Sequence, residues 1–209
     1  MKIETVKVTD FETNCYLAFD PDSGKGFVVD PGGEPEKIIS RIQELGFAPE
    51  FIINTHGHID HIGGDYFISA KFKIPVYIYF LERNFLTEPG LNLSNFSGID
   101  FTPPDLITEI TEEGELRLNG LDLMILHTPG HSCGSISIIF DGVIFSGDLI
   151  FAEGVGRTDL PTGDWAALES SIREKIYSLP DNFRILPGHG PETNVEFEKI
   201  NNPFVKLSR

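Results

Sequence analysis

Four short, largely apolar segments of the chain each run into a turn that combines glycine with histidine or aspartate. These segments are expected to be strands and cover residues 51–53, 121–126, 143–145 and 183–186. Apolar strands of this kind are typical of a sheet that is covered on both faces. The loops that follow them lie at the ends of the sheet, where functional sites are usually built. The pattern therefore predicts an α/β fold in which several strand ends supply one site.

The rest of the chain supports layers of strands and helices. Further strands are expected at residues 3–8, 15–19, 26–29, 76–79 and 136–140. Helices are expected over residues 38–45, over 66–72, and from a cap at Asp164 to a point before Pro180. Residues 81–114 are expected to be irregular, and a loop with a short tail to follow the last strand. Because no linker or repeat divides the sequence, we expect a single domain over residues 1–209.

The charge balance excludes some classes of partner. Sixteen Lys and Arg against 32 Asp and Glu give a formal net charge of −16. A chain this acidic repels phosphate backbones and anionic lipid surfaces, so neither nucleic acid nor a membrane is expected as a partner. The sequence contains no signal-peptide core and no apolar run near the roughly 20 residues of a membrane span. With two distant cysteines, Cys15 and Cys133, a cytoplasmic location is expected.

The histidines are concentrated where the strands are expected to end. His56, His58 and His61 lie with Asp60 in one turn after residues 51–53. A single histidine is more often a hydrogen-bonded core residue than a ligand. Several packed imidazoles without a cation, however, would leave donors and acceptors unsatisfied. Zn²⁺, Mn²⁺ and Fe²⁺ all accept this combination of nitrogen and carboxylate donors.

Three further donors follow other predicted strands, each beside a glycine. They are His131, Asp148 and His189. The total of five histidines and two aspartates is too large for one tetrahedral ion and suits two ions that share a carboxylate. The sequence therefore predicts a dinuclear hydrolytic centre. The sixth histidine, His127, is expected to support a ligand or to bond to the backbone rather than to bind a metal itself.

These residues resemble the signature of the metallo-β-lactamase superfamily, and within it the glyoxalase II-like (hydroxyacylglutathione hydrolase-like) branch. The matching stretches are residues 14–17, 29–33, 55–61 and 127–131, followed by Asp148 and His189. The resemblance implies a four-layer αβ/βα sandwich with its metals at one edge of the facing sheets. It implies a first ion held by His56, His58 and His131, and a second held by Asp60, His61 and His189, with Asp148 bridging the two.

The resemblance also implies a reaction. A hydroxide held between two divalent ions, zinc or alternatively iron or manganese, would hydrolyse a small-molecule hydroxyacyl thioester, with Asp60 and Asp148 as catalytic residues. The β-lactamases place a cysteine among their second-site ligands, and its absence beside Asp148 argues against antibiotic hydrolysis. Only about twenty residues follow His189, so the helical domain that holds glutathione in glyoxalase II is expected to be absent.

Three other functions are weighed against this one. In a persulfide dioxygenase, the resemblance would have His56, His131 and Asp148 hold a single Fe(II). A lactonase and a non-catalytic metal-binding module are less favoured. Seven donors argue against the module, since a structural zinc needs only four.

Substrate recognition is less evident in the sequence. Arg157 lies in the stretch 152–159, which resembles one in short glyoxalase II-like enzymes and persulfide dioxygenases. Its guanidinium could clamp a substrate carboxylate or pair with a neighbouring acidic residue. Residues 91–96 could roof an acyl pocket or pack against the body. Cys15 and Cys133 are expected to be core or near-core residues rather than nucleophiles.

Overall fold

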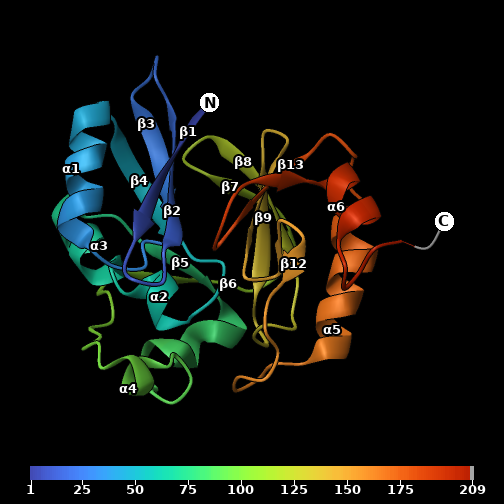
Figure 1. Cartoon of the computed structure of the whole chain (residues 1–209). Coiled ribbons are helices and arrows are strands. Elements are labelled where there is room, and N and C mark those ends of the chain that lie inside the picture. Colours follow the sequence, from blue (N-terminus) through green and yellow to red (C-terminus); the bar gives the residue numbers. More distant parts are fainter. Residues whose placement is uncertain (208–209) are drawn as a thin grey trace. The chain divides into compact units, whose positions relative to one another are not determined.

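The computed structural model describes residues 1–207 and divides the chain into two compact units. The N-terminal unit is Met1–Ile110 and the C-terminal unit is Thr111–Arg209. Each unit combines one six-stranded sheet with helices (Figure 1). The predicted α/β class is therefore confirmed, whereas the single domain over residues 1–209 stays a prediction.

The sheet of the N-terminal unit has its strands in sequence order, β1-β2-β3-β4-β5-β6. The strands are β1 (Lys2–Val8), β2 (Thr13–Asp20), β3 (Lys25–Val29), β4 (Ala48–Ile53), β5 (Val76–Tyr79) and β6 (Ile107–Ile110). β2 is antiparallel to both β1 and β3, and β3 to β6 are parallel. Parallel strands require crossover connections, and the first two are helical. As a result, β3, β4 and β5 end at the same edge of the sheet.

In the strands that carry the site, both faces of this sheet are buried. On one face, α1 (Pro35–Leu45) and α3 (Asp65–Phe72) pack on the strands, as Figure 1 shows, through residues such as Ile38 and Ile68. On the other face, the rings of Phe27 and Phe51 stack with centroids 5.1 Å apart. This burial on both sides explains why the end of β4 is a continuous apolar run.

The sheet of the C-terminal unit has the order β14-β13-β10-β9-β8-β7. The strands are β7 (Gly114–Leu118), β8 (Leu121–His127), β9 (Ile136–Phe140), β10 (Val143–Gly147), β13 (Arg184–Pro187) and β14 (Thr193–Asn194). A hairpin of β11 (Ile150–Phe151) and β12 (Gly154–Val155) follows β10. Because β10 and β13 are parallel neighbours, the loops that follow them leave the same edge of the sheet.

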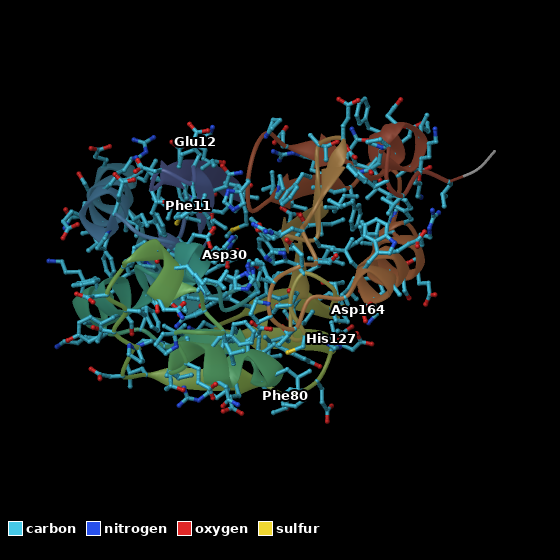
Figure 2. The ribbon with its side chains drawn as sticks, turned by 60° about the horizontal axis from the view of Figure 1, so that its bottom comes forward. Phe11, Glu12, Asp30, Phe80, His127 and Asp164 are labelled. Carbon is cyan, nitrogen blue, oxygen red and sulfur yellow. The ribbon has the colours of Figure 1, made fainter. Side chains whose placement is uncertain are left out.

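Helices at the far end of the chain cover this second sheet. They are α5 (Trp165–Ser170), its π-helical continuation η2 (Ser171–Ile176) and α6 (Val195–Asn201). Asp164, labelled in Figure 2, caps α5 as predicted, since its Oδ1 accepts a hydrogen bond from the Ala167 N–H at 2.8 Å. None of the helices within residues 1–207 combines the length and the apolar character that crossing a bilayer requires.

Two expectations from the sequence are wrong. Residues 81–114 are not wholly irregular, because they contain the end of the 3-10 helix η1 (Phe80–Leu86), a turn of helix α4 (Ser94–Ser97) and β6. The tail is also more ordered than expected, since it holds β14 and α6. These elements are short and lack a periodic apolar pattern. β6 is defined by its pairing with β5, and α6 by its cap at Asn194.

Candidate metal centre

The N-terminal unit brings four predicted ligands together in the turn that follows β4 and includes the short helix α2 (Ile59–Ile62). His56, His58 and His61 are buried, whereas the Asp60 side chain is 18% exposed. The ring of His56 lies 4.8 Å from that of His58 and 4.1 Å from that of His61, measured between centroids. Asp60 Oδ2 lies 3.6 Å from His61 Nε2. This turn therefore holds three buried imidazoles and one partly exposed carboxylate close together.

Asp30 orients one of these histidines from the neighbouring strand. It follows β3 in a left-handed conformation (φ 49°) and is labelled in Figure 2. Its Oδ2 lies 3.0 Å from His61 Nδ1 and accepts a hydrogen bond from Thr55 Oγ1 at 2.6 Å, while its Oδ1 accepts one from the Thr55 N–H at 2.7 Å. A carboxylate that takes the Nδ1 proton fixes the ring and leaves Nε2 as the ligand nitrogen.

The C-terminal unit brings together the other three predicted ligands. Asp148 follows β10 and His189 follows β13, which is the parallel neighbour of β10. Asp148 Oδ2 lies 3.6 Å from His131 Nε2 and 3.6 Å from His189 Nε2. His131 is buried, and the side chains of Asp148 and His189 are 12% and 27% exposed. One carboxylate oxygen thus lies between two imidazole nitrogens.

These separations fit the spacing of metal ligands. At 3.6 Å, a carboxylate oxygen and an imidazole nitrogen are too far apart for a good hydrogen bond. Two atoms bonded to one tetrahedral ion at about 2.1 Å lie about 3.4 Å from each other. The same distance occurs in both units, between Asp60 and His61 and at Asp148. The donor set of each unit therefore fits a divalent cation in chemistry and in spacing.

Main-chain groups hold the C-terminal donors in place. His131 Nδ1 lies 2.8 Å from the main-chain oxygen of Arg157, to which it donates a hydrogen bond because a carbonyl can only accept. Gly156 packs so closely against the main chain of Asp148 that a Cβ at position 156 would lie 1.7 Å from the main-chain oxygen of Asp148. The N-terminal unit has the same kind of contact, because a Cβ on Gly32 would lie 1.5 Å from the main-chain oxygen of Asp60. Glycine is therefore required beside each acidic ligand.

Comparison with known proteins identifies the family. The profile of the Metallo-beta-lactamase superfamily matches residues 8–189. The chain belongs to the metallo-β-lactamase superfamily. It is 40% identical over 211 residues to the hydroxyacylglutathione hydrolase GloC of Haemophilus influenzae, with 98% of each chain covered.

Solved structures agree with this membership in the metallo-β-lactamase superfamily. The B3 metallo-β-lactamase BLEG-1 is 36% identical, with a TM-score of 0.93 over 98% of this chain and 99% of that one. TTHA1623, solved in a di-iron-bound form, is 35% identical, with a TM-score of 0.86 over 96% and 99%. The predicted metallo-β-lactamase fold is confirmed, and the chain is a metallo-hydrolase of a superfamily that binds divalent metals.

Two residues outside the donor sets bear on predictions from the sequence. The Arg157 side chain, 61% exposed, forms two hydrogen bonds of 2.7 Å with Asp159, which is the ion pair that the sequence left as an alternative. This pairing lowers the pKa of Asp159 to about 2. A substrate role for Arg157 stays a prediction.

His127 Nε2 donates to the main-chain oxygen of Cys133 at 2.9 Å, so its ring bonds to the backbone as expected.

The buried thiol also behaves as expected. Cys15 is fully buried in the core of the N-terminal unit. Burial is the main cause that raises the pKa of its thiol, and the carboxylates of Asp30 and Asp65 raise it further. A buried thiol with a raised pKa is a poor nucleophile.

Two functional residues were missed from the sequence, Asp30 and Glu82. Asp30 lies in a stretch that the superfamily resemblance includes, yet nothing in the sequence alone pairs it with His61. Glu82 is buried and accepts a hydrogen bond from the Gly57 N–H. The signal is an acidic residue close to the end of a strand that runs parallel to β4: Asp30 directly follows β3, and Glu82 lies three residues after β5.

Proposed function

We propose that the donors of the two units together hold two divalent ions and that the protein hydrolyses a small hydroxyacyl thioester. In this proposal His56, His58 and His131 hold the first ion, Asp60, His61 and His189 hold the second, and Asp148 bridges them. The observation that carries the metal assignment is the 3.6 Å spacing of carboxylate oxygen and imidazole nitrogen in both units. Similarity to GloC over 98% of both chains supports the choice of a thioester.

Ions in this position would lower the pKa of water toward neutrality and polarise the substrate carbonyl. The leaving thiolate has a conjugate-acid pKa of about 8.5, so it departs without protonation. An amide nitrogen would need a general acid to leave. In this proposal the donors described here would serve as ligands, which favours a thioester, whose leaving group needs no acid, over an amide as the substrate.

The chain's own side chains supply orientation and a proton acceptor. Asp60 Oδ2 accepts a hydrogen bond from Thr13 Oγ1 at 3.4 Å, while the rest of the carboxylate is partly exposed. This places Asp60 to orient the attacking water and to hold its proton. Asp148 Oδ2 lies 3.6 Å from both His131 Nε2 and His189 Nε2, so this carboxylate would supply negative charge to the proposed cations.

A second candidate is β-lactam hydrolysis. The 36% identity and the TM-score of 0.93 to BLEG-1 favour it, against the absence of a cysteine beside Asp148. Both reactions use a water nucleophile attacking a carbonyl carbon, and they differ in the leaving group. The two candidates therefore predict different substrates for the same donors.

The test combines metal analysis with a substrate screen. Protein from its native source is analysed for metals, then assayed with lactoylglutathione, with the β-lactam nitrocefin, and for oxygen consumption on glutathione persulfide. We expect two metal equivalents per chain and thioester hydrolysis above that of metal-free protein. The variant His58→Ala should lose metal and activity, whereas His127→Gln should keep both. A single iron with oxygen consumption would instead identify a dioxygenase and overturn the proposal.

A further inference from the structure

A buried carboxylate contacts the metal-binding turn of the N-terminal unit from the next element of the chain. Glu82 lies in η1, which directly follows β5, and its side chain is 0% exposed. Its Oε2 accepts a hydrogen bond of 2.9 Å from the main-chain N–H of Gly57. Gly57 is the residue between His56 and His58, so Glu82 bonds to the backbone that joins two of the proposed ligands.

The sheet explains why Glu82 reaches this turn. Strands β4 and β5 are parallel neighbours that pair Ile52 with Val76 and Ile53 with Tyr77, so they end at the same edge. The chain that leaves β4 forms the turn with the histidines, and the chain that leaves β5 forms η1. Their carboxyl ends are thus brought side by side, although they lie more than twenty residues apart in the sequence.

The contact between η1 and the turn is tight. A Cβ on Gly57 would lie 2.4 Å from the Phe85 Cβ and 3.1 Å from Glu82 Oε2. The ring of Phe85 also lies 5.9 Å from that of His58, measured between centroids. Gly57 is therefore pressed against η1 with no room for a side chain, and Glu82 forms the polar part of this contact.

We propose that Glu82 is a positioning residue for the metal centre. Its hydrogen bond to Gly57 holds the turn in the shape that directs the imidazoles of His56 and His58 to one ion. The inference rests on the proposed function only in taking these two histidines as ligands. Groups that orient ligands typically change metal affinity by about 10- to 100-fold when they are removed.

Two conservative variants separate the reach of the side chain from its charge. Glu82→Asp keeps the charge but withdraws the carboxylate by one methylene, whereas Glu82→Gln keeps the reach and an acceptor oxygen but removes the charge. Affinity for Co²⁺ is measured by competition with a chelator, and the visible spectrum of the Co²⁺-loaded protein reports the ligand geometry. Ser69→Ala is the control for general destabilisation, since it removes a buried hydrogen bond of 2.6 Å from α3 to the oxygen of Ile74, which lies just beyond the end of that helix.

Positioning predicts an affinity loss of about tenfold or more and an altered Co²⁺ spectrum for Glu82→Asp. It predicts a change below about threefold for Glu82→Gln and for Ser69→Ala. Unchanged affinity in Glu82→Asp, or an equal loss in both Glu82 variants, would overturn the proposal. Failure of the wild-type protein to bind Co²⁺ would instead contradict the metal assignment, so the two failures are distinguishable.

Discussion

At the scale of single residues, two of the proposed ligands are oriented by different kinds of partner. His61 is oriented by the carboxylate of Asp30 and His131 by the main-chain carbonyl of Arg157. A carboxylate makes an imidazole more basic than a carbonyl does, so His61 is expected to be the stronger donor of the two. Both partners lie within the same unit as the histidine they orient.

The ligand types and their positions could be predicted from the sequence, because histidine and aspartate after apolar strands are visible without coordinates. The residues that orient them could not. Asp30 lies 31 residues before His61, and the carbonyl of Arg157 lies 26 residues after His131. A main-chain carbonyl also carries no residue-type signal. Such partners follow from strand register and hairpin geometry, which the sequence pattern does not specify.

A pH-dependent contribution to stability is expected from Glu113. It accepts hydrogen bonds from Lys175 Nζ at 2.5 Å and from the His127 N–H at 3.0 Å, and these contacts, Lys175 first, lower its pKa. A lowered folded-state pKa stabilises the protein above the unfolded-state pKa and is lost as the pH falls through the folded-state value. Glu113→Gln should therefore lower the melting temperature at pH 7, and this deficit should shrink as the pH falls below about 4.

The Glu113 side chain is half exposed, so solvent screening is expected to keep the effect below about 1 kcal/mol. Thermal unfolding followed by circular dichroism between pH 3 and pH 7 measures it. Glu112→Gln, which removes a neighbouring exposed acid, is the matched control and should leave the melting temperature unchanged. A deficit that stays constant down to pH 3 would contradict the pKa assignment.

At the scale of elements, α6 secures the hairpin that follows Asp148. The buried carboxylate of Glu198 accepts hydrogen bonds from the Glu153 N–H, from Thr193 Oγ1 at 2.6 Å and from Asn202 Nδ2 at 2.8 Å. Glu153 lies at the tip of the hairpin β11–β12. Beyond this hairpin lie Gly156 and Arg157, which contact His131 and Asp148. The helix is thus connected to the ligands through the hairpin.

Glu198→Ala is expected to be strongly destabilising. It would remove the shared acceptor of one buried and two part-buried donors, which we expect to cost about 3 kcal/mol in the free energy of unfolding. Urea unfolding measures this loss. Glu196→Ala, an exposed position on the same helix, should change the free energy by less than about 0.5 kcal/mol. Equal stability of the two variants would show that Glu198 does not hold the hairpin.

The elements differ in how well the sequence predicts them. The apolar run that ends β4 and the capped stripe of α5 could be located because burial imposes a pattern on consecutive residues. β6 has only four residues, and only Ile110 among them is buried, so it carries no such pattern. α6 escaped notice because two of its three apolar residues, Phe197 and Ile200, are exposed and only Val195 is buried. Its buried residues include Glu198, which is atypical of a core.

At the scale of the whole molecule, the proposed ligands are divided between the two units. Metal that binds only the folded chain adds to its stability, by about 4 kcal/mol per site when the free metal is 1,000 times its Kd. Removing the metals with a chelator should therefore lower the melting temperature by roughly 10 °C or more in a chain of this size. Differential scanning calorimetry measures the change, and adding back Zn²⁺ should reverse it. An unchanged melting temperature would contradict the proposed binding of metal.

The two glycines that press on the acidic ligands also have a use in comparing sequences. A side chain at position 32 would collide with the main chain of Asp60, and one at position 156 with that of Asp148. Either collision would displace a ligand without changing its identity. A homologue that keeps every histidine and aspartate but has lost one of these glycines is therefore expected to be a degenerate copy that no longer holds metal. The loss of either glycine would reveal such a pseudoenzyme, whereas a comparison of the ligand residues alone would miss it.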